Sequence, residues 1–330
     1  MGFRYGTSAA ALNSKVVCTP NASGYFSATL TGLAKGTTYY YAPYAVVGST
    51  TFVAEEVQSF TTLSVSVNPV VAQSWPELPA EFDSSYSNLH ISTYYAGSER
   101  NYTIAYDKSL YTTYWVAYPL NSGHMGSLSR PGSWSYAPDL ATTYQVDLTN
   151  HTYSTNNSNK GHSRGHLIPN ASRNGNSTMQ LQTFYVINSV PQIQNSFNDG
   201  IWSSLEGAVQ SVAKSEEIYV VSGAALQTAG GSETISYTTA VDEPSKKVPV
   251  PNYFYKLVLK VEKSGSTVTA AKAVGFWFEN KAHSGTDYAS YTKSVNEIEE
   301  LTGFNFFVNL PDTIEEAAES NSSWSTFTAF

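Results

Sequence analysis

The sequence has little cysteine and little charge. Of its 330 residues, one is a cysteine, Cys18, and 13% are Asp, Glu, Lys or Arg. A single cysteine excludes a disulfide within the chain and any zinc or iron–sulfur site built from several cysteines. No run of about 18 apolar residues occurs, so the sequence predicts no transmembrane helix. The first 30 residues contain no basic stretch followed by an apolar segment, so we expect no secretory signal peptide in this chain.

Positive charge is scarcer than negative charge. The chain has 18 Lys and Arg against 26 Asp and Glu, a net charge of −8, and a pI near 5.2. This balance argues against a protein that coats nucleic acid through bulk positive charge. The first 62 residues carry 3 basic and 2 acidic side chains, which leaves 15 and 24 in the remainder, a net charge of −9. Binding of nucleic acid by the larger part would therefore need local cations, and we expect any such binding to be weak and strongly sensitive to salt.

Aromatic residues, by contrast, are abundant. They make up 14% of the chain, including 24 Tyr, and 41% of the residues are hydrophobic. This composition is typical of a globular, β-rich chain, and the length predicts about two domains. Residues 63–82 have the proline and serine content of a linker with hydrophobic anchors. We therefore expect one domain over residues 1–62, a linker over 63–82 and a second domain over 83–330.

The first domain is expected to form short strands at residues 26–30, 37–45 and 59–62, separated by turns that contain glycine. The run from Leu33 to Tyr39, followed by Tyr41, resembles the tyrosine-corner turn and next strand of fibronectin type III modules, and residues 60–62 resemble their last strand. Such a β-sandwich needs roughly 90–100 residues. The resemblance therefore implies a truncated module whose first strands are missing from this chain.

The second domain combines strands with a few separate helices. Helices are predicted at 194–214, from apolar residues at near-helical spacing, and at 293–302, where Ser294 and Glu297 have capping-box spacing and Gly303 follows the end. The absence of a regular strand–helix alternation favours an α+β fold. The predicted strands are 102–106, 114–118, 144–148, 183–187, 218–221, 253–261 and 271–278.

The placement of charge is more informative than its total. No carboxylate occurs between Asp147 and Asp199, whereas Lys160, Arg164 and Arg173 fall inside this span. The span also holds three histidines: His151, His162 and His166. Two interpretations stay open at this point: a polar loop, because Asn, Ser, Thr and Gly fill much of it, or a concavity that binds an anion.

The histidines at 162 and 166 suggest a metal site, in two versions. Two histidines four residues apart on a helix could chelate zinc, but the Glu of the H-E-x-x-H pattern is absent, and Gly165 and Pro169 oppose a helix. A zinc-dependent hydrolase using His162 and His166 is therefore the weaker version. In the other, the end of a β-hairpin presents His166 beside Arg164, and a separate helix supplies the metal ligand.

Three stretches follow one another in a fixed order: Arg164-Gly-His166-Leu-Ile-Pro169, Asn188-Ser-Val-Pro191-Gln192 and Phe197-Asn198-Asp-Gly-Ile-Trp202-Ser-Ser-Leu205-Glu206. Together they resemble the DNA/RNA non-specific endonucleases with a ββα-metal site. The likeness extends over about residues 75–320, with weaker matches upstream at residues 101–106 and 115–118 with Arg130, and downstream at 248–256 and 294–304. The resemblance implies a central antiparallel sheet with flanking helices.

The resemblance assigns a catalytic role to four residues. His166 is the general base, since an imidazole can accept a proton from water at neutral pH. Arg164 and Arg130 contact the scissile phosphate, and Arg130 lies across a variable loop. Glu206, about 12 Å from Asn198 along a continuous helix, orients metal-bound waters from the second shell.

The other implied roles concern the metal and the framework. Asn198 is the single direct protein ligand of Mg²⁺, although Mn²⁺ or another divalent ion would also suit one amide oxygen and several waters. Asn188 and Gln192 are substrate-binding or, by the structural interpretation, framework residues. Two positions depart from the family pattern, because Ser163 stands where Asp is frequent and Gln210 where some members have Arg. Fewer fixed cations would then stabilise the negative charge that develops on the phosphate in the transition state.

The implied function is hydrolysis of DNA and RNA to products with a 5′-phosphate, without sequence preference because nothing in the pattern contacts base edges. The alternative is a catalytically inactive nuclease fold that acts as a binding module of a secreted or surface protein. Retention of both His166 and Asn198 favours the enzyme. By analogy, we expect export from a bacterium, as a secreted, periplasmic or surface-attached protein. The sequence gives no oligomeric state.

Overall fold

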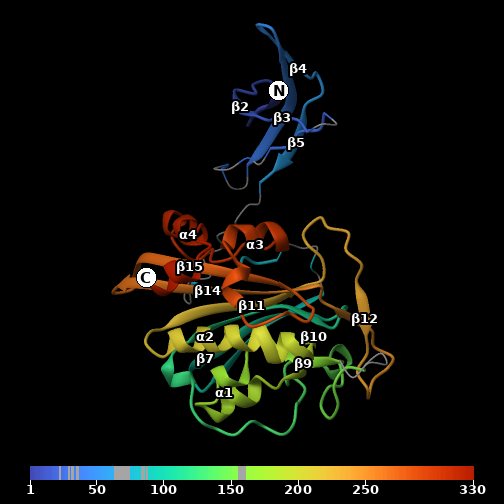
Figure 1. The fold of residues 1–330 in the computed structure, drawn as a ribbon, viewed down its shortest axis with the longest axis vertical. Coiled ribbons are helices and arrows are strands. Elements are labelled where there is room, and N and C mark those ends of the chain that lie inside the picture. The colour runs from blue at the N-terminus through green and yellow to red at the C-terminus, as the bar shows by residue number, and fades with distance from the viewer. Residues whose placement is uncertain are drawn as a thin grey trace. The chain divides into compact units, whose positions relative to one another are not determined.

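The computed structural model describes residues 1–21, 24–28, 30, 33–34, 37–62, 75–82, 86, 88–154 and 161–330. The chain divides into two compact units, Met1–Gln73 and Ser74–Phe330 (Figure 1). Each unit is described by itself. No helix in the described ranges is long and apolar enough to cross a bilayer.

The first unit is a single five-stranded antiparallel sheet in its described part. The central strand β3 (Thr38–Val47) pairs with β1 (Gly2–Gly6) on one side and with β4 (Thr50–Val53) and β5 (Gln58–Thr61) on the other, and β2 (Ser14–Val17) pairs with β1. The predicted strands at 37–45 and 59–62 are therefore present. The described residues of 26–30 form no strand, so that prediction is wrong.

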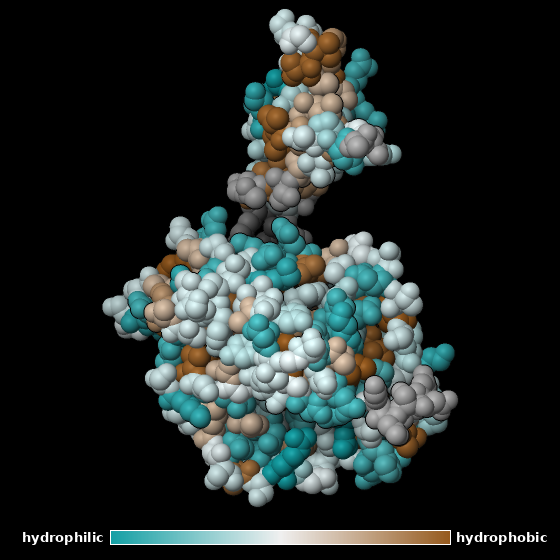
Figure 2. All heavy atoms as spheres, in the orientation of Figure 1, coloured by the Kyte–Doolittle hydropathy of each residue, from teal (hydrophilic) through white to brown (hydrophobic). Residues whose placement is uncertain are grey.

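One hydrogen bond in this unit bears on the fibronectin resemblance. The Tyr39 hydroxyl accepts a hydrogen bond from the Ala34 backbone N–H at 3.0 Å, as a tyrosine corner would. Lys35 and Gly36 of the same turn lie outside the described residues, and one sheet is present where a sandwich needs two. The resemblance stays a prediction. Figure 2 shows apolar side chains at the surface of this unit. Val47 and Phe52, next to the β3–β4 turn, are exposed.

The second unit is built on a seven-stranded antiparallel sheet, with strand order β16-β15-β14-β11-β8-β7-β6. Three neighbouring pairs, β6–β7, β7–β8 and β14–β15, are joined by short turns, which suits antiparallel pairing. A separate short pair, β12 (Ser236–Thr238) and β13 (Val248–Val250), forms an arm beside the sheet (Figure 1). The strands of the main sheet are β6 (Leu89–Ala96), β7 (Glu99–Asp107), β8 (Thr112–Leu120), β11 (Ile218–Ala225), β14 (Tyr253–Ser264), β15 (Thr267–Glu279) and β16 (Thr292–Lys293).

Both faces of this sheet are buried. Helices α1 (Ser177–Gln182) and α2 (Ser203–Ala213) lie on one side, and α3 (Val295–Thr302) and α4 (Asp312–Glu319) on the other (Figure 1). Because side chains alternate along a strand, Phe254 and Val258 join the core under α2, and Tyr255 and Leu257 join the core under α3. The remaining helical segments are α5 (Trp324–Thr328), η1 (Ser122–His124), η2 (Thr142–Tyr144), η3 (Asn170–Ser172), η4 (Val186–Asn188), η5 (Gln194–Trp202) and η6 (Tyr288–Tyr291).

Local sequence signals succeed where the chain is regular. Helix α3 has the predicted capping box between Ser294 and Glu297, and it ends at Gly303 with φ of 73°. The predicted strands at 144–148 and 183–187 are wrong. Tyr144 ends η2, and the Gln145 side chain takes up the backbone groups of Ala137. Thr183 caps α1, and residues 186–188 form η4, so the β-branched composition of this stretch serves core packing without strand pairing.

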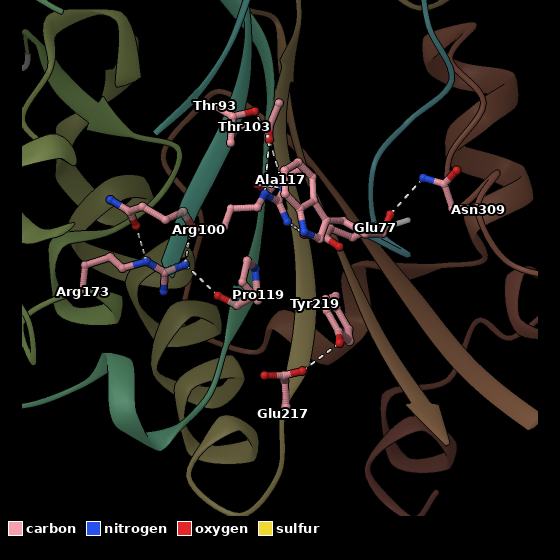
Figure 3. A network of polar contacts seen from close by, with 12 residues as sticks. Glu77, Thr93, Arg100, Thr103, Ala117, Pro119, Arg173, Glu217, Tyr219 and Asn309 are labelled. Carbon is pink, nitrogen blue, oxygen red and sulfur yellow. Dashed lines mark hydrogen bonds and ion pairs between the residues drawn. The ribbon is translucent and has the colours of Figure 1, made fainter. Parts of the chain in front are cut away.

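Part of the predicted linker belongs to the second unit. Glu77 is fully buried and forms an ion pair with Arg100 of β7 (Figure 3). The Arg100 guanidinium lies 3.9 Å from the centroid of the Trp75 ring and donates a 2.9 Å hydrogen bond to the Ala117 carbonyl. The hydrophobic anchors in residues 75–82 thus dock onto the sheet, and the boundary lies before residue 75, not at 82.

Loss of the Glu77 carboxylate should destabilise the second unit. We expect Glu77→Ala to lower the free energy of unfolding by about 3 kcal/mol, because it leaves the buried Arg100 charge uncompensated. Urea denaturation of the whole chain measures this change. Glu279→Ala is the control, since Glu279 pairs with Lys281 at the surface and should contribute less than about 1 kcal/mol. Equal effects of the two substitutions would contradict the expectation.

Candidate active site

The candidate site is a cleft of about 590 Å³ at the strand pair β9 (His162–His166) and β10 (Ser189–Ile193). Side chains at alternate positions of β9 share one face, so Arg164 and His166 both line the cleft. Arg130, Asn198 and Glu206 also line it. The structure therefore brings together the five residues for which sequence analysis expects a catalytic or metal-binding role. The chain from β9 through β10 into η5 and α2 gives the ββα order.

Gly165 allows the two strands to lie this close. A Cβ atom placed there would come within 2.6 Å of the Gln192 Cβ atom, closer than side-chain atoms can approach. Only glycine therefore fits between Arg164 and His166 without moving β10.

The ring of His166 is half-buried and packs against two aromatic rings. Its centroid lies 4.5 Å from that of Trp134 and 4.9 Å from that of Phe184. Burial lowers the pKa of His166 to about 3, and the nearby charges of Arg130 and Arg164 act in the same direction. Nε2 has no hydrogen-bond partner among the described residues. With its pKa lowered in this way, the imidazole is neutral at pH 7 and keeps one nitrogen able to accept a proton.

The two arginines supply the positive charge of the cleft. Arg164 donates a 2.7 Å hydrogen bond from Nη1 to the Leu148 carbonyl, and burial lowers the pKa of its guanidinium. Arg130 is exposed on a loop. In the part of the chain that the structure describes, neither guanidinium forms an ion pair with a carboxylate. An anion such as phosphate would therefore find uncompensated charge here.

Asn198 lies in η5, which is irregular. Ser196 has a left-handed φ of 61°, and Gly200 has φ of −113° with ψ of −111°, so regular helix starts only with α2. The prediction of one continuous helix over 194–214 is therefore wrong, and the spacing of about 12 Å drawn from it does not apply. The Asn198 side chain donates from Nδ2 to Gln194 Oε1 at 3.0 Å, which fixes the amide with Oδ1 as the group able to accept a cation.

Glu206 lies in the first turn of α2, near the buried Lys256. Sequence analysis assigned no role to this lysine. Burial raises the pKa of Glu206, and the charge of Lys256 opposes this. Lys256 is 1% exposed and donates to Ser222 Oγ at 2.9 Å, and its Nζ atom lies 4.5 Å from the Trp202 ring centroid. Burial lowers its pKa, while Glu206 raises it. The available signal was a lone lysine inside the apolar run 253–259.

Asn188 and Gln192 do not line the cleft. The Asn188 amide accepts from the Ile168 N–H and donates to the carbonyls of Ile168 and Thr183, at 2.7–3.0 Å. Gln192 is fully buried, and neither polar atom of its side chain has a hydrogen-bond partner among the described residues. Both side chains are therefore buried in the framework, in line with the structural interpretation, and their contact with substrate stays a prediction.

The stretch without carboxylates between Asp147 and Asp199 contributes fewer positive charges to the cleft than its sequence suggests. Arg173 is fully buried and donates to Asn101 Oδ1 at 2.6 Å and to the Pro119 carbonyl at 2.6 Å (Figure 3). His151 pairs with Asp242 at 2.8 Å. Lys160 lies outside the described residues. The local cations are thus Arg164 together with Arg130, which precedes the span.

The zinc version fails on strand geometry. His162 and His166 are four residues apart on a strand, about 13 Å at roughly 3.3 Å per residue, which is too far for one ion. Within the described ranges, no group of three His, Cys, Asp or Glu side chains could hold a metal ion. The two departures from the family pattern make local bonds, Ser163 to the Gln192 carbonyl and Gln210 to Ser172.

Comparison with known proteins decides the family. Residues 86–313 match the family described as DNA/RNA non-specific endonuclease. The chain belongs to this family. The endonuclease domain is thus a hydrolase that acts on nucleic acids, in a family of metal-dependent nucleases.

Relatives of this endonuclease come from bacteria and from mitochondria. A nuclease of Nostoc sp. is 29% identical over 228 residues, which cover 67% of this chain and 76% of that protein. The mitochondrial nuclease EXOG of Homo sapiens is 27% identical and shares 64% of this chain and 57% of its own length. The nuclease of Serratia marcescens is 24% identical, with 66% and 77% covered.

A solved structure supports the fold of the endonuclease. The crystal structure of the EndoG/EndoGI complex contains a chain that aligns with a TM-score of 0.54 at 19% identity, covering 68% of this chain and 88% of that one. The likeness concerns the fold alone. It agrees with a mixed α/β fold built on antiparallel sheets with few helices.

Proposed function

We propose that this endonuclease is Mg²⁺-dependent and cleaves DNA and RNA without sequence preference, leaving 5′-phosphate ends. One observation carries the proposal. His166, whose Nε2 has no hydrogen-bond partner among the described residues, lines the same cleft as Asn198 and as two arginines that form no ion pair with a described carboxylate. A base, a phosphate clamp and a cation ligand thus lie within one cavity.

The donor set of the cleft fits a hard divalent cation. Asn198 offers one amide oxygen, and Glu206 can hold water molecules around an ion without binding it directly. Mg²⁺ dehydrates reluctantly and suits such a water-rich site, and Mn²⁺ or another divalent ion would also be accepted. When bound, the ion supplies Lewis-acid polarisation of the phosphodiester and stabilises charge on the leaving 3′ oxygen.

The side chains of the chain account for the remaining steps. Arg164 and Arg130 grip the scissile phosphate and offset the charge that grows on it in the transition state. His166 Nε2 accepts a proton from a water molecule that attacks the phosphorus opposite the 3′ oxygen. The bond between phosphorus and the 3′ oxygen breaks, so the phosphate stays on the 5′ side of the product.

The proposed breadth of substrate follows from the lining of the cleft. Its charged groups are suited to phosphate oxygens, and phosphate contacts carry no sequence information. Cleavage of the phosphodiester bonds of both DNA and RNA is therefore proposed. Export from a bacterium is proposed as well, and the bacterial relatives in Nostoc and Serratia are compatible with it.

Plasmid DNA and a long RNA, each incubated with the purified chain, test the proposal. We expect both to be cut when Mg²⁺ is present, no cutting in EDTA, and recovery when Mg²⁺ is added back. End labelling should find 5′-phosphates. Recovery with Zn²⁺ alone would overturn the metal assignment, and lack of cleavage with any divalent ion would favour the inactive binding module.

Removal of the exposed arginine should weaken substrate binding in a salt-dependent way. Arg130→Ala removes one phosphate contact, so we expect KM to rise about tenfold and the slope of log affinity against log salt to fall by about 1. Cleavage rates of a short duplex at 50–200 mM NaCl measure both quantities. Lys214→Ala, at an exposed lysine after α2, is the control and should leave the slope unchanged. An unaltered slope in Arg130→Ala would remove Arg130 from the phosphate site.

A further inference from the structure

Two aromatic rings pack against the proposed base, His166, and against each other. The centroids of Trp134 and His166 are 4.5 Å apart, those of His166 and Phe184 are 4.9 Å apart, and those of Trp134 and Phe184 are 5.3 Å apart. All three pairs are tilted or edge-to-face, a favourable arrangement for aromatic rings. We call Trp134 and Phe184 the aromatic platform. Sequence analysis gave neither residue a role.

Each ring of the platform also contacts the guanidinium group of one of the two arginines. The Arg164 guanidinium carbon lies 5.1 Å from the centroid of the Trp134 ring, and that of Arg130 lies 5.1 Å from the centroid of Phe184. Both distances are within the range of a cation–π contact. Arginine side chains carry about 2 kcal/mol of rotamer entropy, so a ring face that restrains them reduces the freedom lost when phosphate binds.

The backbone holds the two platform residues side by side. Ser135, next to Trp134, donates its N–H to the Phe184 carbonyl at 3.0 Å, and Val186 donates to the Ser135 carbonyl at 2.9 Å. These bonds attach the exposed loop of Arg130 to the segment between α1 and β10. Arg130 is therefore placed by the platform, although its own loop position is exposed.

Resting on the proposed function, the geometry points to Trp134 and Phe184 as positioning residues that hold the base and both phosphate-binding arginines as one unit. The His166 ring packs against both Trp134 and Phe184, so ring packing restrains the direction of its imidazole. A displacement of about 1 Å in such a group can cost on the order of a hundredfold in rate. The same rings keep water from the imidazole, which accounts for part of its lowered pKa.

The alternative is that these rings only fill the core, since Trp134 is 6% and Phe184 1% exposed. Two substitutions of Trp134 separate the alternatives. Trp134→Phe keeps a ring face under Arg164, whereas Trp134→Leu keeps apolar bulk without one. Trp277→Leu on β15, where the indole stacks on Tyr253 and Tyr255, is the matched control for loss of a packed tryptophan.

We expect Trp134→Leu to lower kcat by about 10- to 100-fold, and Trp134→Phe to recover most of it. Trp277→Leu, at a partly buried indole far from the cleft in sequence and not lining it, should lower stability and leave kcat unchanged. The acidic limb of the kcat/KM profile should move to higher pH in Trp134→Leu, because a hydrated His166, between Arg130 and Arg164, becomes protonated at a higher pH. If Trp134→Leu does not fold, Phe184→Leu is measured against Phe184→Tyr with the same readouts.

Two results would overturn the inference: kcat equal in the Leu and Phe variants of Trp134, or a pH profile in Trp134→Leu that matches the wild type. Its failure can be told apart from failure of the proposed function. If His166→Ala keeps full activity, the function is wrong; if His166→Ala is inactive while Trp134→Leu behaves as the wild type, only the role of the platform is wrong.

Discussion

Replacement of His166 by alanine should lower kcat by on the order of a thousandfold, with little change in KM. The loss follows from removal of the group that accepts the proton of the attacking water, and general base catalysis typically contributes about 10²- to 10⁴-fold. Arg164 and Arg130 still bind the phosphate in this variant, so affinity should persist. Single-turnover cleavage of a labelled duplex measures the chemical step, and equal rates in wild type and variant would exclude His166 as the base.

A control histidine makes this result specific. His90 on β6 is hydrogen-bonded to Asp139 at 3.1 Å and does not line the cleft. His90→Ala should therefore cleave at the wild-type rate. A loss of activity in both variants would indicate a general effect on the fold.

The lowered pKa of His166 also fixes the sign of a stability effect. Its pKa is about 3 in the folded chain and near ~6.5 in an unfolded one, so the unfolded state binds more protons between these values. This histidine therefore makes the free energy of unfolding decrease as pH falls from about 6.5 toward 3. Urea denaturation at pH 7 and pH 4.5 should show a smaller decrease in His166→Gln than in the wild type.

Replacement of Asn198 by alanine is the second large effect. It removes the one amide oxygen proposed to bind the ion, and loss of Lewis-acid catalysis worth several kcal/mol corresponds to a rate decrease on the order of a thousandfold. The affinity for Mn²⁺, titrated by calorimetry without substrate, should fall as well. Asn198→Asp keeps an oxygen ligand and should retain metal binding better than the alanine variant.

The matched control for Asn198 is its neighbour in the same irregular segment. Asn195 is exposed and lies three residues earlier in η5, so Asn195→Ala tests disturbance of the segment without loss of the proposed ligand. We expect normal Mn²⁺ binding and normal cleavage. Unchanged Mn²⁺ affinity in Asn198→Ala would exclude Asn198 as the ligand.

The sequence predicts best what is set by local chemistry. The cap of α3 depends on Ser294 and Glu297 alone, and the long strands β14 and β15 follow from their apolar composition. The order of the three stretches around His166, Asn198 and Glu206 led to one cleft, because β9 and β10 pair with each other and β10 continues through η5 into α2.

What failed depends on partners distant in sequence. Arg173 looks like a surface cation, yet it is buried because Asn101 and Pro119 supply acceptors for its guanidinium. Lys256 looks like an interruption of a strand, and its place below Glu206 appears only when β14 lies beside α2. The break at Gly200 likewise depends on backbone angles that an apolar periodicity does not encode.

The contact of Trp75 and Glu77 with Arg100 has a mechanical consequence. The first described residues of the second unit are bound to the sheet by the Trp75 ring, which stacks on Arg100, and by the buried Glu77–Arg100 ion pair. A pull on the chain at residue 75 would therefore act first on β7 and β8, which supply the Arg100 side chain and the Ala117 carbonyl, and not on β9 or β10 of the cleft.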